Sequence, residues 1–134
     1  MADFNKAWYK TSAIEGGYSN NSKDSGKETY RGIAIASNPN WIGWNYVHKA
    51  IKDLGIVDTL DAGYSVWKRI DNALYGNPEL NNVVSSMYKK NYWDTINLDE
   101  EPDQLIAEQV FDTAVNMGVT TAKKFIEEAR KENA

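Results

Sequence analysis

Apolar residues recur at three- and four-residue intervals in several separate stretches of the chain. Because residues at these intervals share one face of a helix, each stretch predicts an amphipathic helix. The first stretch contains Phe4, Ala7, Trp8 and Ile14 and leads directly to Glu15. The others are Trp41, Trp44, His48, Ile51 and Leu54; Val66, Trp67, Ile70 and Leu74; Leu80, Val83, Val84 and Met87 with Tyr92; Leu105, Ile106, Val110, Phe111, Ala114 and Val115; and Ala122, Phe125, Ile126 and Ala129.

Residues 16–36 break this pattern and are rich in Gly and Asn. They end in a short apolar segment, residues 32–36, which is typical of a strand. We interpret the region as a small β-hairpin, because Gly and Asn are the residues that tight turns require. About six helices and one hairpin predict a mainly α domain of the α+β class.

Glycine and proline mark the expected helix ends. Gly55 and Gly118 follow apolar runs, where helices commonly end in a left-handed residue. Pro102 is expected at the first position of a helix. The acidic residues 99–101 precede it, and their charge suits the positive end of the helix dipole.

Composition narrows the classes of function. The formal net charge of −4 argues against a nucleic-acid partner, because phosphate contacts need clustered Lys and Arg. The chain has no Cys and one His, which argues against a zinc site, and we expect no metal and no cofactor. The N-terminus lacks the pattern of a signal peptide, and no apolar run approaches the roughly 18 residues of a membrane span. The sequence therefore does not indicate where the protein is localised. We expect the protein to be a monomer.

Glu15 is the first candidate for chemistry, because it ends an apolar run and two glycines follow it. Hydrolysis of a glycosidic bond needs an acid that protonates the leaving oxygen. Burial against Ile14 and nearby aromatic residues would raise the pKa of Glu15 and suit it to that role. The alternative is a solvated Glu at a helix C-terminus, a position that the helix dipole disfavours.

Asp24 and Glu28 are the candidates for a second carboxylate, and both lie in the predicted hairpin. The alternative for Asp24 is a turn residue that bonds its own backbone, and for Glu28 a solvated strand position. Thr29 is a candidate for holding the attacking water, although a strand Thr is usually structural. Neighbouring strand residues point to opposite faces, so Glu28 points away from the catalytic cleft if Thr29 faces it. If Thr29 faces the cleft, Asp24 is therefore preferred over Glu28 as the second carboxylate, and the interpretation of Asp24 as an ordinary turn residue stays open.

These motifs resemble the glycoside hydrolase family 108 muramidases, which are lysozyme-like enzymes of phages, prophages and bacteria. The matching segments are Glu15–Asn20, Asp24 and Gly26–Ile33, where Lys27 stands at the second Gly of the family pattern. Residues 88–94 and 111–118 are similar to the predicted peptidoglycan-binding domain that accompanies this family. The resemblance covers most of the chain, although residues 37–78 match only loosely.

The resemblance implies a single lysozyme-like domain over residues 1–134, with a catalytic part at 1–87 and a peptidoglycan-binding-like part at 88–134. It implies cleavage of the β-1,4 bond between N-acetylmuramic acid and N-acetylglucosamine in peptidoglycan, with Glu15 as the general acid. Family members usually continue past the position of Ala134, so the resemblance also implies a truncated or a naturally short chain. We expect an inverting mechanism, because a hairpin loop favours a wide separation of the two carboxylates.

Sugar binding is expected at aromatic and amide side chains, since aromatic rings stack on sugars and an Asn can bond an acetamido group. Two other functions stay open at this point. A non-catalytic peptidoglycan-binding module would sediment with cell walls without clearing them. A lytic transglycosylase would leave an anhydro-muramyl end. The candidate substrate-binding residues are Tyr18, Tyr30, Trp93 and Asn116.

Overall fold

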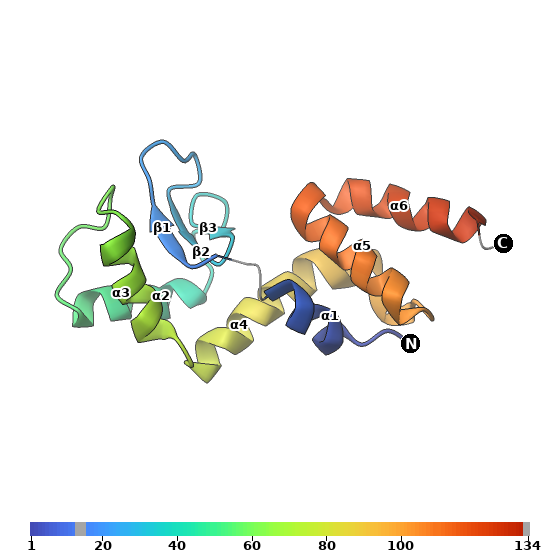
Figure 1. The fold of residues 1–134 in the computed structure, drawn as a ribbon, viewed down its shortest axis with the longest axis horizontal. Coiled ribbons are helices and arrows are strands. Elements are labelled where there is room, and N and C mark those ends of the chain that lie inside the picture. The colour runs from blue at the N-terminus through green and yellow to red at the C-terminus, as the bar shows by residue number, and fades with distance from the viewer. Residues whose placement is uncertain (13–15, 133–134) are drawn as a thin grey trace. The chain divides into compact units, whose positions relative to one another are not determined.

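A computed structural model of the protein describes residues 1–12 and 16–132. The described residues form six α-helices and one small antiparallel sheet, so the predicted α+β class is confirmed (Figure 1). In these residues no helix has both the length and the apolar character that a membrane crossing needs. The elements are α1 (Phe4–Ser12), β1 (Tyr18–Asn20), β2 (Glu28–Tyr30), β3 (Ile33–Ala34), α2 (Gly43–Asp53), α3 (Tyr64–Leu74), α4 (Pro78–Tyr88), α5 (Gln104–Met117) and α6 (Val119–Glu132).

The chain divides into two compact units. The helical unit contains Met1–Ile14 and Ser85–Ala134, and the sheet unit contains Glu15–Val84. The chain passes between them a second time inside α4. The expected division into residues 1–87 and 88–134 has a similar boundary, but α1 groups with the C-terminal half of the chain. The catalytic and wall-binding roles of the two parts stay predictions.

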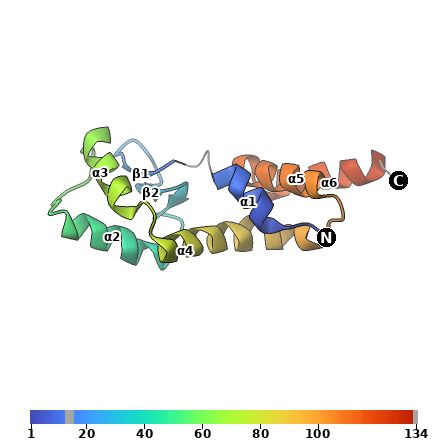
Figure 2. The same cartoon turned by 60° about the horizontal axis from the view of Figure 1, so that its bottom comes forward.

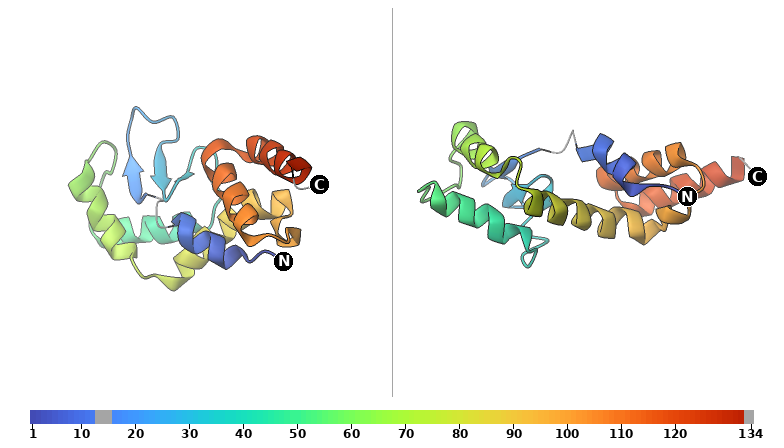
Figure 3. Two further views of the ribbon diagram at one scale, coloured as in Figure 1. Left: turned by 45° about the vertical axis from the view of Figure 1, so that its right-hand side comes forward. Right: turned by 90° about the horizontal axis from the view of Figure 1, so that it is seen from below.

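The sheet has the strand order β1-β2-β3, with each neighbouring pair antiparallel. The predicted hairpin is therefore extended by a third strand, and the apolar segment 32–36 contributes only Ile33–Ala34 to it. Tyr18 lies opposite Tyr30, and Tyr30 lies opposite Ile33. All three side chains are buried, so they form the covered face of the sheet. The helices α2 and α3 pack on each other, and α3 packs on β1 (Figure 3).

Aromatic rings form the core of the helical unit. Phe4, Trp93 and Phe111 make three edge-to-face contacts with centroid separations of 5.4–5.8 Å. Trp93 reaches this core through a π-helical turn at Lys89–Trp93, so the helix predicted to run on from Leu80 ends as an α-helix at Tyr88. Around the rings, α5 packs against both α1 and α6 (Figure 2).

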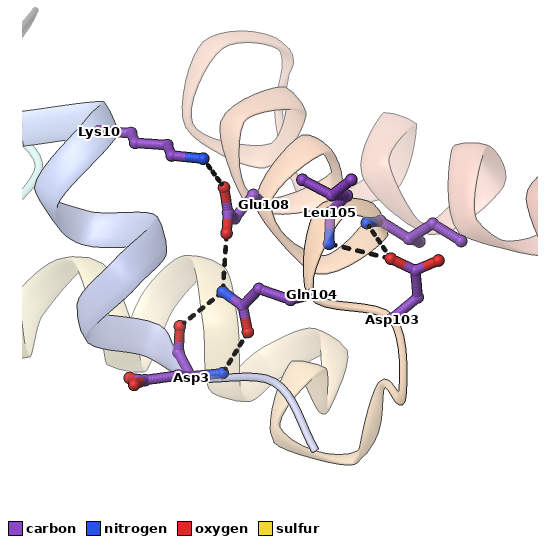
Figure 4. A network of polar contacts seen from close by, with 7 residues as sticks. Asp3, Lys10, Asp103, Gln104, Leu105 and Glu108 are labelled. Carbon is purple, nitrogen blue, oxygen red and sulfur yellow. Dashed lines mark hydrogen bonds and ion pairs between the residues drawn. The ribbon is translucent and has the colours of Figure 1, made fainter.

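Two helix ends agree with the sequence and one start does not. Gly55 and Gly118 follow α2 and α5 with φ of 72° and 97°, so both predicted helix stops are confirmed. The expectation for Pro102 is wrong, because α5 begins at Gln104. Asp103 caps that helix, and its carboxylate accepts bonds from the Leu105 and Ile106 N–H groups (Figure 4). The Asp103 carboxylate satisfies two N–H groups of the first turn, whereas Pro102, one residue earlier, has no side-chain acceptor for them.

A polar network joins α5 to the N-terminal segment of the helical unit. The Gln104 amide accepts a bond from the Asp3 N–H group and donates to the Asp3 carbonyl oxygen (Figure 4). It also donates to Glu108, whose other carboxylate oxygen pairs with Lys10 of α1. These contacts connect residues about a hundred positions apart in the sequence, and they fix the packing of α1 on α5.

Candidate functional site

Glu15 lies outside the residues that the structure describes, but the glycines after it can be placed. A Cβ atom added at Gly17 would lie 2.1 Å from Oδ2 of Asp71, whereas one added at Gly16 would meet nothing within 4 Å. The Tyr18 N–H group donates a 2.7 Å bond to Oδ1 of the same carboxylate. Asp71 therefore clamps the chain to α3 immediately before β1, and the clamp requires a glycine at position 17.

Asp71 is a functional candidate that the sequence analysis did not identify. Burial raises the pKa of its carboxyl group, and the bond from Tyr18 N–H opposes that rise. The available signal is an Asp placed directly after Ile70, a fully buried residue of α3. A lone acidic residue near an apolar stripe is too weak a pattern to identify a partner in β1, which lies 53 residues earlier in the chain.

Asp24 and Thr29 converge on Gly26 at the tip of the sheet. The position where a Gly26 side chain would begin lies 3.3 Å from Oδ1 of Asp24 and 3.6 Å from Oγ1 of Thr29. Oδ1 of Asp24 accepts a 2.9 Å bond from the Gly26 N–H group, and the Thr29 hydroxyl donates a 3.3 Å bond to the Lys27 carbonyl oxygen. Asp24 and Thr29 therefore flank Gly26, and the side-chain oxygen of each makes a local bond to the backbone of the hairpin.

Glu28 faces the other side of the sheet. Its Oε2 atom accepts a 2.8 Å bond from the Tyr18 hydroxyl and lies 3.0 Å from Nε2 of His48. The Tyr18 hydroxyl also bonds Oγ1 of Thr59, and burial raises the pKa of that hydroxyl well above its usual value. Because Thr29 pairs with Ser19 and Glu28 with Asn20, the predicted alternation of residues 28 and 29 is confirmed.

An open cleft of about 680 Å³ lies between the loop that joins β1 to β2 and the segment around Leu60. Glu28 and Asp24 both line it, and Thr29 is not among its lining residues. Most of the lining residues are polar or charged, and Ile35 and Leu60 are the apolar ones. The remaining residues of this hairpin cleft are Asn20, Asn21, Ser22, Ser25 and Lys27.

The aromatic residues predicted to bind sugar are placed in the core. Tyr18 is 4%, Tyr30 5% and Trp93 0% exposed, so none of these rings offers a face to a ligand in this structure. The indole N–H of Trp93 donates to Oδ1 of Asp99 within the helical unit. The sequence shows that these residues are aromatic but does not show whether they are buried. The strand register determines the burial of Tyr18 and Tyr30, and the π-helical turn determines that of Trp93.

Asn116 is exposed on α5 of the helical unit, where its amide donates to the carbonyl and carboxylate oxygens of Asp112. Gly118 occupies the C-cap position of α5, two residues after Asn116. In the described part of the chain, no three His, Cys, Asp or Glu residues are grouped as a metal ion would require.

Comparison with known families gives one result. The family model described as Glycosyl hydrolase 108 matches residues 9–118. That span includes the Glu15–Asn20 segment, the sheet with Asp24 and Thr29, and the whole of α5. Searches of curated proteins and of solved structures found no match. Because the match covers most of the chain, this protein belongs to glycosyl hydrolase family 108 and is a glycoside hydrolase.

Proposed function

We propose that the protein is a peptidoglycan hydrolase that cleaves the β-1,4 bond between N-acetylmuramic acid and N-acetylglucosamine. The observation that carries the proposal is the family match over residues 9–118, which spans Glu15 and the sheet. The convergence of Asp24 and Thr29 at Gly26 supports it, because a carboxylate and a hydroxyl at one strand end can together hold a water molecule.

The proposed reaction uses two carboxyl groups, one as the general acid and one as the general base. Glu15 gives its proton to the glycosidic oxygen as the bond from that oxygen to the anomeric carbon breaks. A water molecule held by Thr29 attacks the anomeric carbon, and its proton passes to Asp24. The products are two free saccharide ends, and exchange of protons with solvent restores the acid and the base.

Asp24 suits the role of base better than Glu28 does. Glu28 already accepts a bond from Tyr18 and contacts His48 through one oxygen, on the face of the sheet away from Thr29. Asp24 is exposed and lies next to Thr29 across Gly26. The base should therefore be the carboxylate on the Thr29 side.

The test is digestion of purified peptidoglycan, with mass analysis of the released fragments. Glu15→Gln should lower the rate by about 10²–10⁴-fold, the usual value of general acid catalysis. Glu127→Gln on the exposed surface of α6 is the matched control and should retain full activity. Asp24→Asn should lower the rate more than Glu28→Gln does, once circular dichroism shows each variant to be folded.

Specific outcomes contradict the proposal. Anhydro-muramyl ends in the fragments would identify a lytic transglycosylase, and binding to cell walls without fragments would identify a non-catalytic module. A folded Glu15→Gln variant that keeps more than about a tenth of the rate would remove Glu15 from the role of acid.

A further inference from the structure

The hairpin cleft contains a cation at a backbone position that disfavours it. Lys27 has φ of 59°, in the left-handed region where a side chain is strained and glycine is preferred. Lys27 lines the cleft, and it makes no ion pair with any residue that the structure describes. Backbone strain of this kind destabilises the fold and clusters at active sites and ligand-binding sites.

The cleft offers both signs of charge beside an apolar surface. Lys27 supplies an ammonium group, and Asp24 and Glu28 supply carboxylates. Leu60 is 50% exposed, and together with Ile35 it forms an apolar wall. A ligand that fits this set carries a carboxylate, an amine and small alkyl groups. A neutral sugar chain can accept a hydrogen bond from the ammonium group of Lys27 but offers no opposite charge.

Backbone bonds hold the two walls of the cleft in place. The Ser22 N–H group donates a 2.9 Å bond to Oδ1 of Asp61, and the Asp61 N–H group donates a 2.8 Å bond to the Asn20 carbonyl oxygen. The bond from Ser22 lowers the pKa of Asp61, as expected for an ionised acceptor. Because these bonds join the hairpin loop to Asp61, the residue after Leu60, the cleft is formed before a ligand arrives, which reduces the entropic cost of binding.

We propose that the hairpin cleft binds the peptide stem of peptidoglycan, with Lys27 contacting a stem carboxylate and Glu28 contacting the stem amine. The proposal rests on the proposed function, because the stem is attached to the muramic acid whose bond is cleaved. Alanine methyl groups of the stem would lie against Leu60 and Ile35. Binding of the stem beside Asp24 would orient the glycan strand on the sheet, so substrates that carry stems should be preferred.

The direct test is titration with a synthetic tetrapeptide of alanine, D-glutamate, lysine and D-alanine. The wild-type protein should bind it, with amide shifts at Asn20 and Leu60 in NMR spectra. Lys27→Gln and Lys27→Gly should each weaken binding by about threefold to tenfold, the range for one partly exposed charged contact. Lys27→Gly relieves the strained φ, so unfolding cannot explain its loss. Lys23→Gln, in the same loop but outside the cleft, should bind as the wild type does.

A second measurement links binding to substrate choice. The ratio of kcat/KM on intact peptidoglycan to kcat/KM on amidase-stripped glycan should fall in both Lys27 variants and stay constant in Lys23→Gln. The proposal is overturned if the wild type does not bind the tetrapeptide, or if Lys23→Gln weakens binding as much as Lys27→Gln. It is also overturned if N-acetylglucosamine oligomers shift the same amides and Lys27→Gln has no effect. Peptide binding by a protein that hydrolyses neither substrate would contradict the proposed function alone.

Discussion

Gly17→Ala should destabilise the protein, because the added methyl group would occupy the place of the Asp71 carboxylate. The Cβ atom would lie 2.1 Å from Oδ2 and 2.4 Å from Cγ of Asp71, far inside van der Waals contact. The side chain of Asp71 is short, so it can avoid the methyl group only by rotating away from the backbone of residues 17 and 18. That rotation breaks the 2.7 Å bond from the Tyr18 N–H group.

The magnitude follows from the bond that is lost. A hydrogen bond to a charged acceptor contributes about 1.5–3 kcal/mol, and leaving a partly buried N–H group without a partner has a similar cost. A water molecule can reach a partly buried site, so we expect a loss of about 1–3 kcal/mol in the free energy of unfolding. The reduced freedom of alanine in the unfolded chain offsets about 0.4–1 kcal/mol of this loss.

Urea denaturation followed by circular dichroism measures this difference. Gly16→Ala is the matched control, because nothing lies within 4 Å of its added methyl group and it should change stability by less than about 0.5 kcal/mol. Combining Gly17→Ala with Asp71→Ala should cost less than the sum of the two single changes, since the second removes the clash. Equal losses of stability in Gly16→Ala and Gly17→Ala, or strict additivity of Gly17→Ala with Asp71→Ala, would refute this role of the Asp71 carboxylate.

Two other changes test the polar contacts of the sheet unit. Tyr18→Phe removes the hydroxyl that joins Thr59 to Glu28. It should lower the free energy of unfolding by about 1–2 kcal/mol in the same urea assay. An unchanged denaturation midpoint would refute a structural role for that hydroxyl. Burial raises the pKa of Asp71, so above the usual Asp pKa the folded state binds more protons at this site than the unfolded state does. Stability should therefore fall as pH rises through that window, and Asp71→Asn should flatten this part of a pH series; an unchanged slope would contradict the raised pKa.

The parts of the fold that follow from local rules were predictable from the sequence. Gly55 and Gly118 end helices because only a residue tolerant of positive φ fits there, and both adopt positive φ. The opposite facing of Glu28 and Thr29 follows from strand geometry alone. These inferences needed no information about distant parts of the chain.

The parts that depend on distant partners were not predictable. Pro102 had the composition of a helix start, but the side chain of Asp103 satisfies the first N–H groups of α5 instead. Trp93 was a candidate for sugar binding until the π-helical turn placed it against Phe4 and Phe111. Contacts with residues elsewhere in the fold determine the start of α5 and the burial of Trp93, and a local sequence pattern does not specify such contacts.

The contacts of Glu28 bear on which carboxylate can act as a base. A base must receive a proton from water and release it in every cycle. Glu28 would receive that proton while one of its oxygens is shared by Tyr18 and His48, so protonation there would weaken contacts that hold β1 and α2 together. Asp24, in the described part of the chain, has one oxygen bonded to the Gly26 backbone and is open to solvent. Proton transfer to Asp24 therefore disturbs a single turn, and the fold can tolerate it in each cycle.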